Sequence, residues 1–243
     1  MIKQTVGLLA TYAVAFMLAG ASAKADTITF TAANGATGEA DFIFGTNTLT
    51  LTLKNTTVNP SDVAFNISGL EFILSGGTGA TLTNETSPES RTVNSDKTFT
   101  DAGPVNGIAN VGWVYSHSSD TEFKLDVLSG TGHAGPANTI LGLPAADNKY
   151  DAANSGIAGN GAHNPFLASS VTYTFTFASG VNADTHVTEA QAQFGTTDNT
   201  FFSVCNGNCV VTQTGQTPEP GTMLLTIVGV GLLGIGSFRK VRS

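Results

Sequence analysis

The sequence predicts an all-β fold, a single antiparallel β-sandwich domain of jelly-roll type. Residues 48–53 (Thr-Leu-Thr-Leu-Thr-Leu) and 171–177 (Val-Thr-Tyr-Thr-Phe-Thr-Phe) alternate polar and apolar side chains strictly. This is the period of a strand with one buried face. Threonine, glycine and asparagine are abundant, and only 12% of the residues are charged. Many short strands separated by turns are typical of a sandwich or a jelly roll.

Further strand candidates follow along the chain. They are rich in β-branched and aromatic residues, and they comprise Thr27–Thr31, Asp41–Phe44, Ala64–Leu74, Val111–Ser116, Glu122–Leu128 and His186–Phe194. Glycine-rich turns separate them, as at residues 76–79 and at Asn106-Gly107. A short helical period around Thr188–Phe194 is the alternative for the last candidate.

Two segments show no regular period. Ser129–Ala162 is dominated by glycine, alanine and asparagine, and Asn94–Asn110 is similarly irregular. Long loops on a rigid scaffold are where binding sites tend to be built. If the domain binds a ligand, we expect the site in these two segments.

The only tryptophan lies in Val-Gly-Trp-Val-Tyr, residues 111–115. Alternation places Val111, Trp113 and Tyr115 on one face of a strand. We expect that face in the core, because sandwiches commonly bury a tryptophan. An exposed aromatic platform for a sugar is the alternative.

Cys205 and Cys209 are the only cysteines, and they enclose Asn-Gly-Asn. Apolar residues on both sides predict a hairpin whose three-residue loop uses Gly207 at positive φ. In an exported chain, we expect a Cys205–Cys209 disulfide across the mouth of this hairpin. A metal pair is the alternative, but two thiolates need further ligands, and no other cysteine or histidine is near in sequence.

The first 25 residues predict a secretory signal peptide. Lys3 supplies a weak positive start, residues 6–20 are uncharged, and Ala-x-Ala triplets end at Ala23 and at Ala25. The mature chain therefore begins at Lys24 or at Asp26. We divide the chain into a signal peptide (1–25), an exported all-β domain (26–217) and a C-terminal tail (218–243).

The tail has three parts. Pro218, Glu219 and Pro220 come first, the apolar run Met223–Phe238 follows, and a basic cluster ends the tail with Arg239, Lys240 and Arg242. The apolar run would be about 24 Å long as a helix, slightly shorter than a hydrocarbon core of about 30 Å. We expect a marginal transmembrane helix, with the basic cluster held on the cytoplasmic side of the inner membrane.

This combination resembles the PEP-CTERM sorting signal of exopolysaccharide-producing bacteria. The resemblance rests on the order of the triplet, the span and the basic end, and it covers residues 218–243 together with the signal peptide. It implies exosortase as a partner, processing near the triplet, and delivery from an inner-membrane intermediate to the cell surface or the extracellular matrix. An ordinary membrane anchor with a stiff linker is the alternative.

Charge excludes one class of partner. Residues 26–217 carry five basic side chains against 17 acidic ones, a net charge of −12. The five are Lys54, Arg91, Lys97, Lys124 and Lys149. Such a surface repels phosphate, so we expect no nucleic-acid binding.

Motifs for catalysis are missing. The sequence contains neither G-x-S-x-G nor H-E-x-x-H, and His117, His133, His163 and His186 are scattered. The acid pairs Asp120/Glu122 and Asp147/Asp151 fit solvated charge better than a calcium site in a loop, which is the alternative. We therefore expect no catalytic residues, no metal site and no cofactor.

The function predicted from these observations is that of a non-enzymatic exported protein of the surface or of a polysaccharide-rich biofilm matrix. A secreted carbohydrate-binding module of jelly-roll type is the second hypothesis. A secreted hydrolase is the third, because the 17 acidic residues could supply a pair of carboxylates across a cleft.

Overall fold

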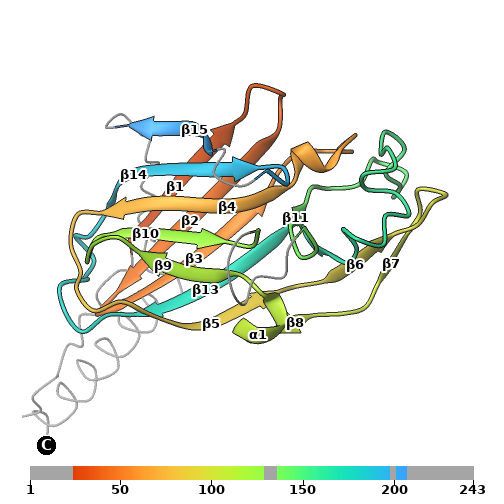
Figure 1. Cartoon of the computed structure of the whole chain (residues 1–243). Helices are drawn as coiled ribbons and strands as arrows, with labels where there is room; N and C mark the ends of the chain where they lie inside the picture. Colours follow the sequence, from red (N-terminus) through yellow and green to blue (C-terminus); the bar gives the residue numbers. More distant parts are fainter. Residues whose placement is uncertain (1–23, 129–135, 198–200, 207–243) are drawn as a thin grey trace, which may run out of the picture.

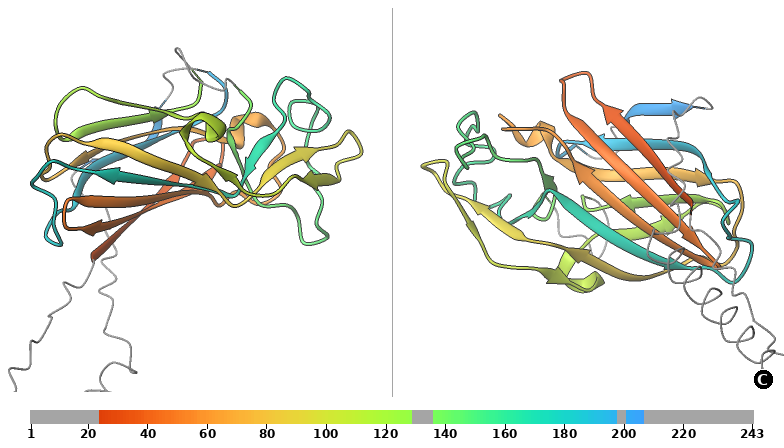
Figure 2. Two further views of the ribbon diagram at one scale, coloured as in Figure 1. Left: turned by 90° about the horizontal axis from the view of Figure 1, so that it is seen from below. Right: turned by 180° about the vertical axis from the view of Figure 1, so that it is seen from behind.

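A computed structural model describes residues 24–128 and 136–197, together with the backbone of residues 201–206. Two β-sheets lie face to face, so the predicted β-sandwich is confirmed (Figure 1). Figure 2 shows the two layers from below and the first sheet from behind. Within the described residues, the helices are the 3₁₀ turn η1 (Val63–Phe65) and the four-residue α1 (Ile108–Val111).

The first sheet is antiparallel throughout. Its strands, in spatial order, are β1 (Lys24–Thr31), β2 (Thr37–Gly45), β3 (Thr48–Asn55), β13 (Ser170–Thr176), β5 (Thr81–Ser87) and β8 (Val105–Asn106). The predicted leucine–threonine alternation lies in β3, where all three leucines are fully buried and the threonines between them are partly exposed.

The second sheet divides beside its central strand. From the outer edge it runs β15 (Phe201–Asn206), β14 (Val187–Phe194) and β4 (Ile67–Leu74). Along Gly69–Ile73, β4 pairs with β10 (Glu122–Asp126), which pairs with β9 (Val114–His117). At Ile67, β4 pairs instead with β11, and the sheet continues through β11 (Ile140–Leu141), β12 (Phe166–Ala168), β6 (Ser90–Val93) and β7 (Phe99–Asp101). The pair β11–β12 is parallel.

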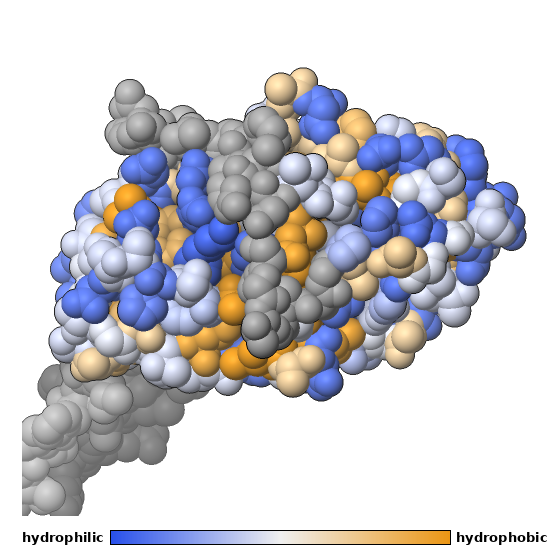
Figure 3. Space-filling view, in the orientation of Figure 1, coloured by the Kyte–Doolittle hydropathy of each residue, from blue (hydrophilic) through white to orange (hydrophobic). Residues whose placement is uncertain are grey.

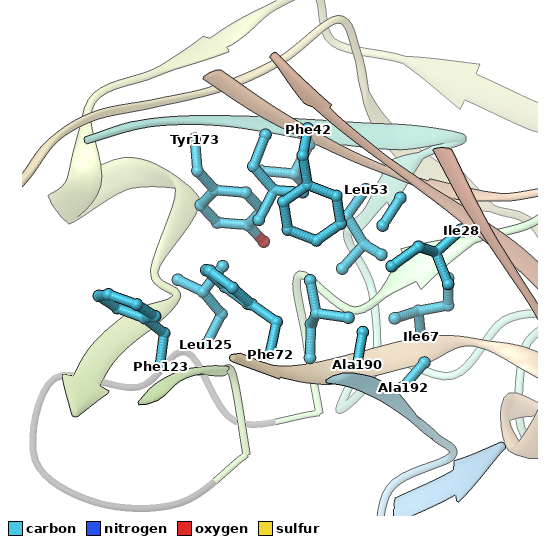
Figure 4. Close-up of a cluster of buried hydrophobic side chains, with 14 of the residues drawn as sticks. Ile28, Phe42, Leu53, Ile67, Phe72, Phe123, Leu125, Tyr173, Ala190 and Ala192 are labelled. Carbon is cyan, nitrogen blue, oxygen red and sulfur yellow. The ribbon is translucent and has the colours of Figure 1, made fainter. Parts of the chain in front are cut away.

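Aromatic rings fill the space between the sheets. Phe72 of β4 lies at their centre, with its ring centroid 5.2 Å from that of Phe42, 5.0 Å from Phe123 and 6.4 Å from Phe175. Figure 4 shows Phe72 and Phe123 pointing from the second sheet toward Phe42 and Tyr173 of the first. Burial of each such ring stabilises the fold by roughly 1.5–3 kcal/mol.

A second apolar cluster lies beneath residues 136–162, within the segment predicted as an irregular loop. Tyr150, Ala153 and Ile157 are buried there against Val93 and Phe166. The segment also contributes β11 to the second sheet. From Pro136 onward this loop is therefore a packed part of the domain.

Several predicted elements need correction. The predicted strand Val111–Ser116 is wrong over its first part, because Val111 ends α1 and Gly112 takes φ 75°, which breaks the pleat before β9. Ala64–Leu74 begins as η1 and becomes a strand only at Ile67.

The helical alternative for residues 188–194 is wrong as well. These residues form β14, which pairs with β4 on one side and β15 on the other. Hydrogen bonding on both edges outweighs a weak local helical period.

Candidate functional site

The outer face of the second sheet carries a polar depression. It encloses about 240 Å³ above β4, β9 and β10. Its polar lining consists of Glu71, Ser116, His117, Ser118, Glu122 and Lys124. A smaller hollow adjoins it over β14 and shares Glu71 and Glu122. Figure 3 shows hydrophilic side chains grouped on this face of the molecule.

Acidic side chains outnumber basic ones in this depression, with Glu71 and Glu122 against Lys124. The ammonium of Lys124 lies 3.4 Å from Asp126 Oδ2 and 4.0 Å from Glu71 Oε1. Glu71 also accepts a hydrogen bond from the side-chain amide of Gln191 on β14. Carboxylates, an ammonium and hydroxyls in one hollow can donate and accept hydrogen bonds to a polyhydroxyl ligand. The long, partly exposed pair of Lys124 and Glu71 adds little to stability.

A second hollow opens at the edge of the sandwich between β5 and β9. It encloses about 430 Å³, and its lining is largely apolar, with Ala80, Leu82, Ile108, Trp113, Val114 and Tyr115. In Figure 1, α1 and β8 lie beside β5 at this edge. Trp113 itself is fully buried, and its Nε1–H donates to the carbonyl oxygen of Asn138 at 3.0 Å. Its predicted core position is confirmed, and the sugar-platform alternative is wrong.

A carboxyl group is buried behind this hollow. Glu85 of β5 is fully buried, and neither oxygen makes a hydrogen bond within the described residues. Burial raises the pKa of Glu85 from 4.5 to about 8. The backbone N–H of Trp113 faces the carboxyl group without meeting strict hydrogen-bond geometry, and it offsets only part of that shift. The carboxyl group is therefore mainly neutral at pH 7.

Tyr173 faces Glu85 from the neighbouring strand. The two residues are register partners in β13 and β5, and the Tyr173 hydroxyl has no hydrogen-bond partner in the described part of the chain. Burial raises the pKa of Tyr173, and the nearby Glu85 raises it further. The ring of Tyr173 lies 5.7 Å from that of Trp113, between centroids.

The alternation of polar and apolar residues in the sequence did not predict that Glu85 faces the core. Leu82 and Glu85 are three residues apart, which puts them on opposite faces of a regular strand. A register shift in β5 pairs Leu82 with Phe175 and Asn84 with Thr174, so one extra residue lies between them. This bulge turns Glu85 into the core.

The described histidines and acid pairs do not converge. His117 lines the polar depression, the Nδ1 of His163 lies 2.7 Å from the Gly156 carbonyl oxygen, and His186 is exposed. No group of three or more histidine, cysteine, aspartate or glutamate side chains in the described ranges is placed to hold a metal ion. His133 lies outside those ranges.

None of the six predicted sorting residues lies in the described part of the chain. Pro218, Glu219, Pro220, Arg239, Lys240 and Arg242 lie outside the described residues, together with the predicted span and signal peptide residues 1–23. Among the residues that the structure does describe, no helix has the length and apolar character needed to span a membrane.

The structure describes one of the two cysteines of the predicted disulfide. Cys205 lies on β15 opposite Ala190 of β14. Cys209 lies outside the described residues, so the bond stays a prediction. The strand β15 includes Asn206, which the hairpin prediction had assigned to the loop.

Comparison with known proteins identifies the tail. Residues 216–241 match the family model described as the PEP-CTERM protein-sorting motif. No curated protein and no solved structure matches the chain. The match includes the Pro-Glu-Pro triplet, the apolar run and the first part of the basic cluster. Residues 216–241 are therefore a PEP-CTERM sorting motif, which implies export by membrane-associated sorting with exosortase as the processing partner.

Proposed function

We propose that the mature protein is a non-enzymatic β-sandwich of the cell surface or of the exopolysaccharide matrix of a biofilm. In this proposal a signal peptide delivers the chain, a helix at Met223–Phe238 holds it in the inner membrane, and exosortase removes the tail. The match of residues 216–241 to the sorting motif is the observation that carries the proposal.

The surface chemistry of the domain supports this role. Two of the basic side chains are paired with acidic neighbours, Lys54 with Glu39 at 2.8 Å and Arg91 with Asp101 at 2.6 Å. The remaining acidic excess keeps the surface hydrated and soluble. A domain of this kind suits a hydrated polymer matrix.

Fractionation of a host that has exosortase tests the sorting step. The full chain, a chain lacking 218–243 and a Pro218→Ala/Glu219→Ala/Pro220→Ala variant would be followed by immunoblot in membrane, surface and medium fractions. We expect the full chain at the surface and the triplet variant in the inner membrane. Surface delivery of the triplet variant at the same rate would contradict the proposal.

Carbohydrate binding by a jelly-roll-type domain is the second candidate function. The polar depression over β4, β9 and β10 favours it, because its mixed donors and acceptors suit sugar hydroxyls. In this candidate, Lys124 donates to the sugar, and Glu71 and Glu122 accept from it.

A glycan array tests this second candidate. Lys124→Gln should weaken binding about tenfold, the loss expected for one charged hydrogen bond. Lys54→Gln is the matched control, since Lys54 lies on the other sheet. We also propose that the domain needs no metal. Parallel arrays with calcium and with a chelator test this, because binding should then be the same in both conditions. An array without signal in both conditions would count against carbohydrate binding.

A further inference from the structure

The four-residue helix α1 closes the edge of the sandwich between β8 and β9. Glycines at positive φ stand at both ends, Gly107 at 90° and Gly112 at 75°. The N–H of Gly107 donates to the carbonyl oxygen of Glu85 at 2.8 Å, which joins α1 to β5. Other residues rarely adopt such φ values, so the chain direction can change sharply at either end of α1.

One side chain holds the far end of α1 in place. The amide of Asn138 donates to the carbonyl oxygens of Asn110 at 3.3 Å and Val111 at 3.0 Å. The backbone oxygen of Asn138 accepts the Trp113 Nε1–H. Asn138 has φ 62°, a conformation that asparagine and glycine tolerate. Asn138 therefore fastens both α1 and the tryptophan that follows it.

Glu85 lies beneath this closed edge. Its carboxyl group and the hydroxyl of Tyr173 are both buried and without hydrogen-bond partners among the described residues. Tyr173 on β13 is a titratable group beside Glu85, and the Glu85 charge raises its pKa. The sequences of β8 and α1 contain no titratable side chain, and Trp113 adds none. Tyr115 of β9 lines the adjoining hollow.

Ionisation of Glu85 would be incompatible with these surroundings. An unpaired carboxylate in an apolar interior is strongly disfavoured, so the charged form requires water. The hollow of about 430 Å³ beside α1 reaches Trp113, whose backbone N–H faces Glu85. Displacement of α1 would extend this hollow to the carboxylate.

We propose that α1 is a proton-controlled plug, seated while Glu85 is protonated and displaced on its two glycine pivots when Glu85 ionises. Displacement admits water to the carboxylate and exposes an apolar surface that includes Ile108, Trp113 and Tyr115. The device is separate from the sorting motif, and it gives the exported domain an alkaline-sensitive contact surface.

The single tryptophan reports directly on this event. Acrylamide quenching of Trp113 fluorescence would be measured on the full chain in detergent micelles between pH 6 and pH 9.5. Because burial raises the pKa of Glu85 to about 8, we expect the quenching constant to rise several-fold with a midpoint near that pH. Glu85→Gln should remain weakly quenched throughout. Asn138→Gly removes the side-chain hydrogen bonds that hold α1, and glycine adopts the φ of 62° without strain. In this variant the quenching constant should rise at a lower pH than in the wild-type protein.

Two results would overturn the proposal: wild-type protein that stays weakly quenched up to pH 9.5, or a Glu85→Gln variant with the same transition. If Glu85→Gln does not fold, infrared titration of wild-type protein provides the test. The carboxylic C=O band should disappear with the same midpoint as the rise in quenching. A rise without loss of that band would contradict the plug.

Discussion

Arg91 and Tyr150 tie the packed loop to the second sheet. The Arg91 Nη1 donates to the Tyr150 hydroxyl at 3.0 Å, and that hydroxyl donates to the Gly142 carbonyl oxygen at 2.9 Å. The same guanidinium makes two hydrogen bonds to the Asp101 carboxylate and lies 3.8 Å from the centre of the Phe99 ring. One arginine thus joins β6, β7 and the loop.

Arg91→Ala should therefore destabilise the domain by about 2–3 kcal/mol, the scale of losing hydrogen bonds to a charged, half-buried group. Arg91→Lys should recover only part of this, because an ammonium cannot form the planar fork. Urea unfolding of the full chain measures both. Lys54→Ala, which breaks more exposed ion pairs with Glu39 and Asp41, should cost at most about 1 kcal/mol. Equal losses for Arg91→Ala and Lys54→Ala would contradict the role assigned to Arg91.

Glu85 makes stability depend on pH. Between pH 4.5 and about 8, the unfolded chain loses this proton while the folded domain keeps it. The free energy of unfolding should therefore fall as pH rises through this window, by up to about 1.4 kcal/mol per pH unit, and level off above it. Urea midpoints at pH 5 and pH 7.5 measure the slope. Glu85→Gln should flatten it, and an unchanged slope would show that other groups cause the dependence.

Substitution of Phe72 tests how much the aromatic core contributes to stability. Removal of this buried ring leaves a cavity among Phe42, Phe123 and Phe175, so Phe72→Ala should cost about 3–5 kcal/mol. Ile43→Ala on the outer face, where Ile43 is 39% exposed, should cost about 0.5 kcal/mol or less. Thermal unfolding compares the two. Similar losses for both variants would mean that Phe72 is not a centre of the core.

The start of β1 bears on signal-peptide cleavage. Lys24 and Ala25 already pair with Phe44 and Ile43 of β2, and a cut after Ala25 would remove both. We predict a cut after Ala23, which leaves β1 whole and places Lys24 at the mature N-terminus. N-terminal sequencing of exported protein measures this. Ala23→Leu should block the cut and Ala25→Leu should not; a mature chain that begins at Asp26 would contradict the prediction.

The strictly alternating strands were predictable from sequence. In β3 and β13, threonine and apolar residues alternate without a break, so a single local period determines which face is buried. The burial of Trp113 followed from the same reasoning, although its strand was misplaced because Gly112 bends the chain before β9.

The rest depends on contacts distant in sequence. β5 and β6 were missed because their polar residues become strands only by pairing with β13 and β12. The burial of Tyr150 depends on Val93 and Phe166, which lie on other elements. Glu85 faces inward through a bulge that no alternation predicts. The sorting tail, in contrast, is read from sequence alone, because its function resides in a linear pattern.

Intact-mass measurement of the surface form tests the central claim most directly. The full chain would be expressed in cells with active exosortase and in cells that lack it. We predict that the surface protein from the first cells ends near Pro218-Glu219-Pro220 and lacks Arg239, Lys240 and Arg242, whereas the second cells retain the whole tail in the inner membrane. A surface protein that still carries residues 221–243, or the same mass in both cell types, would contradict sorting by exosortase.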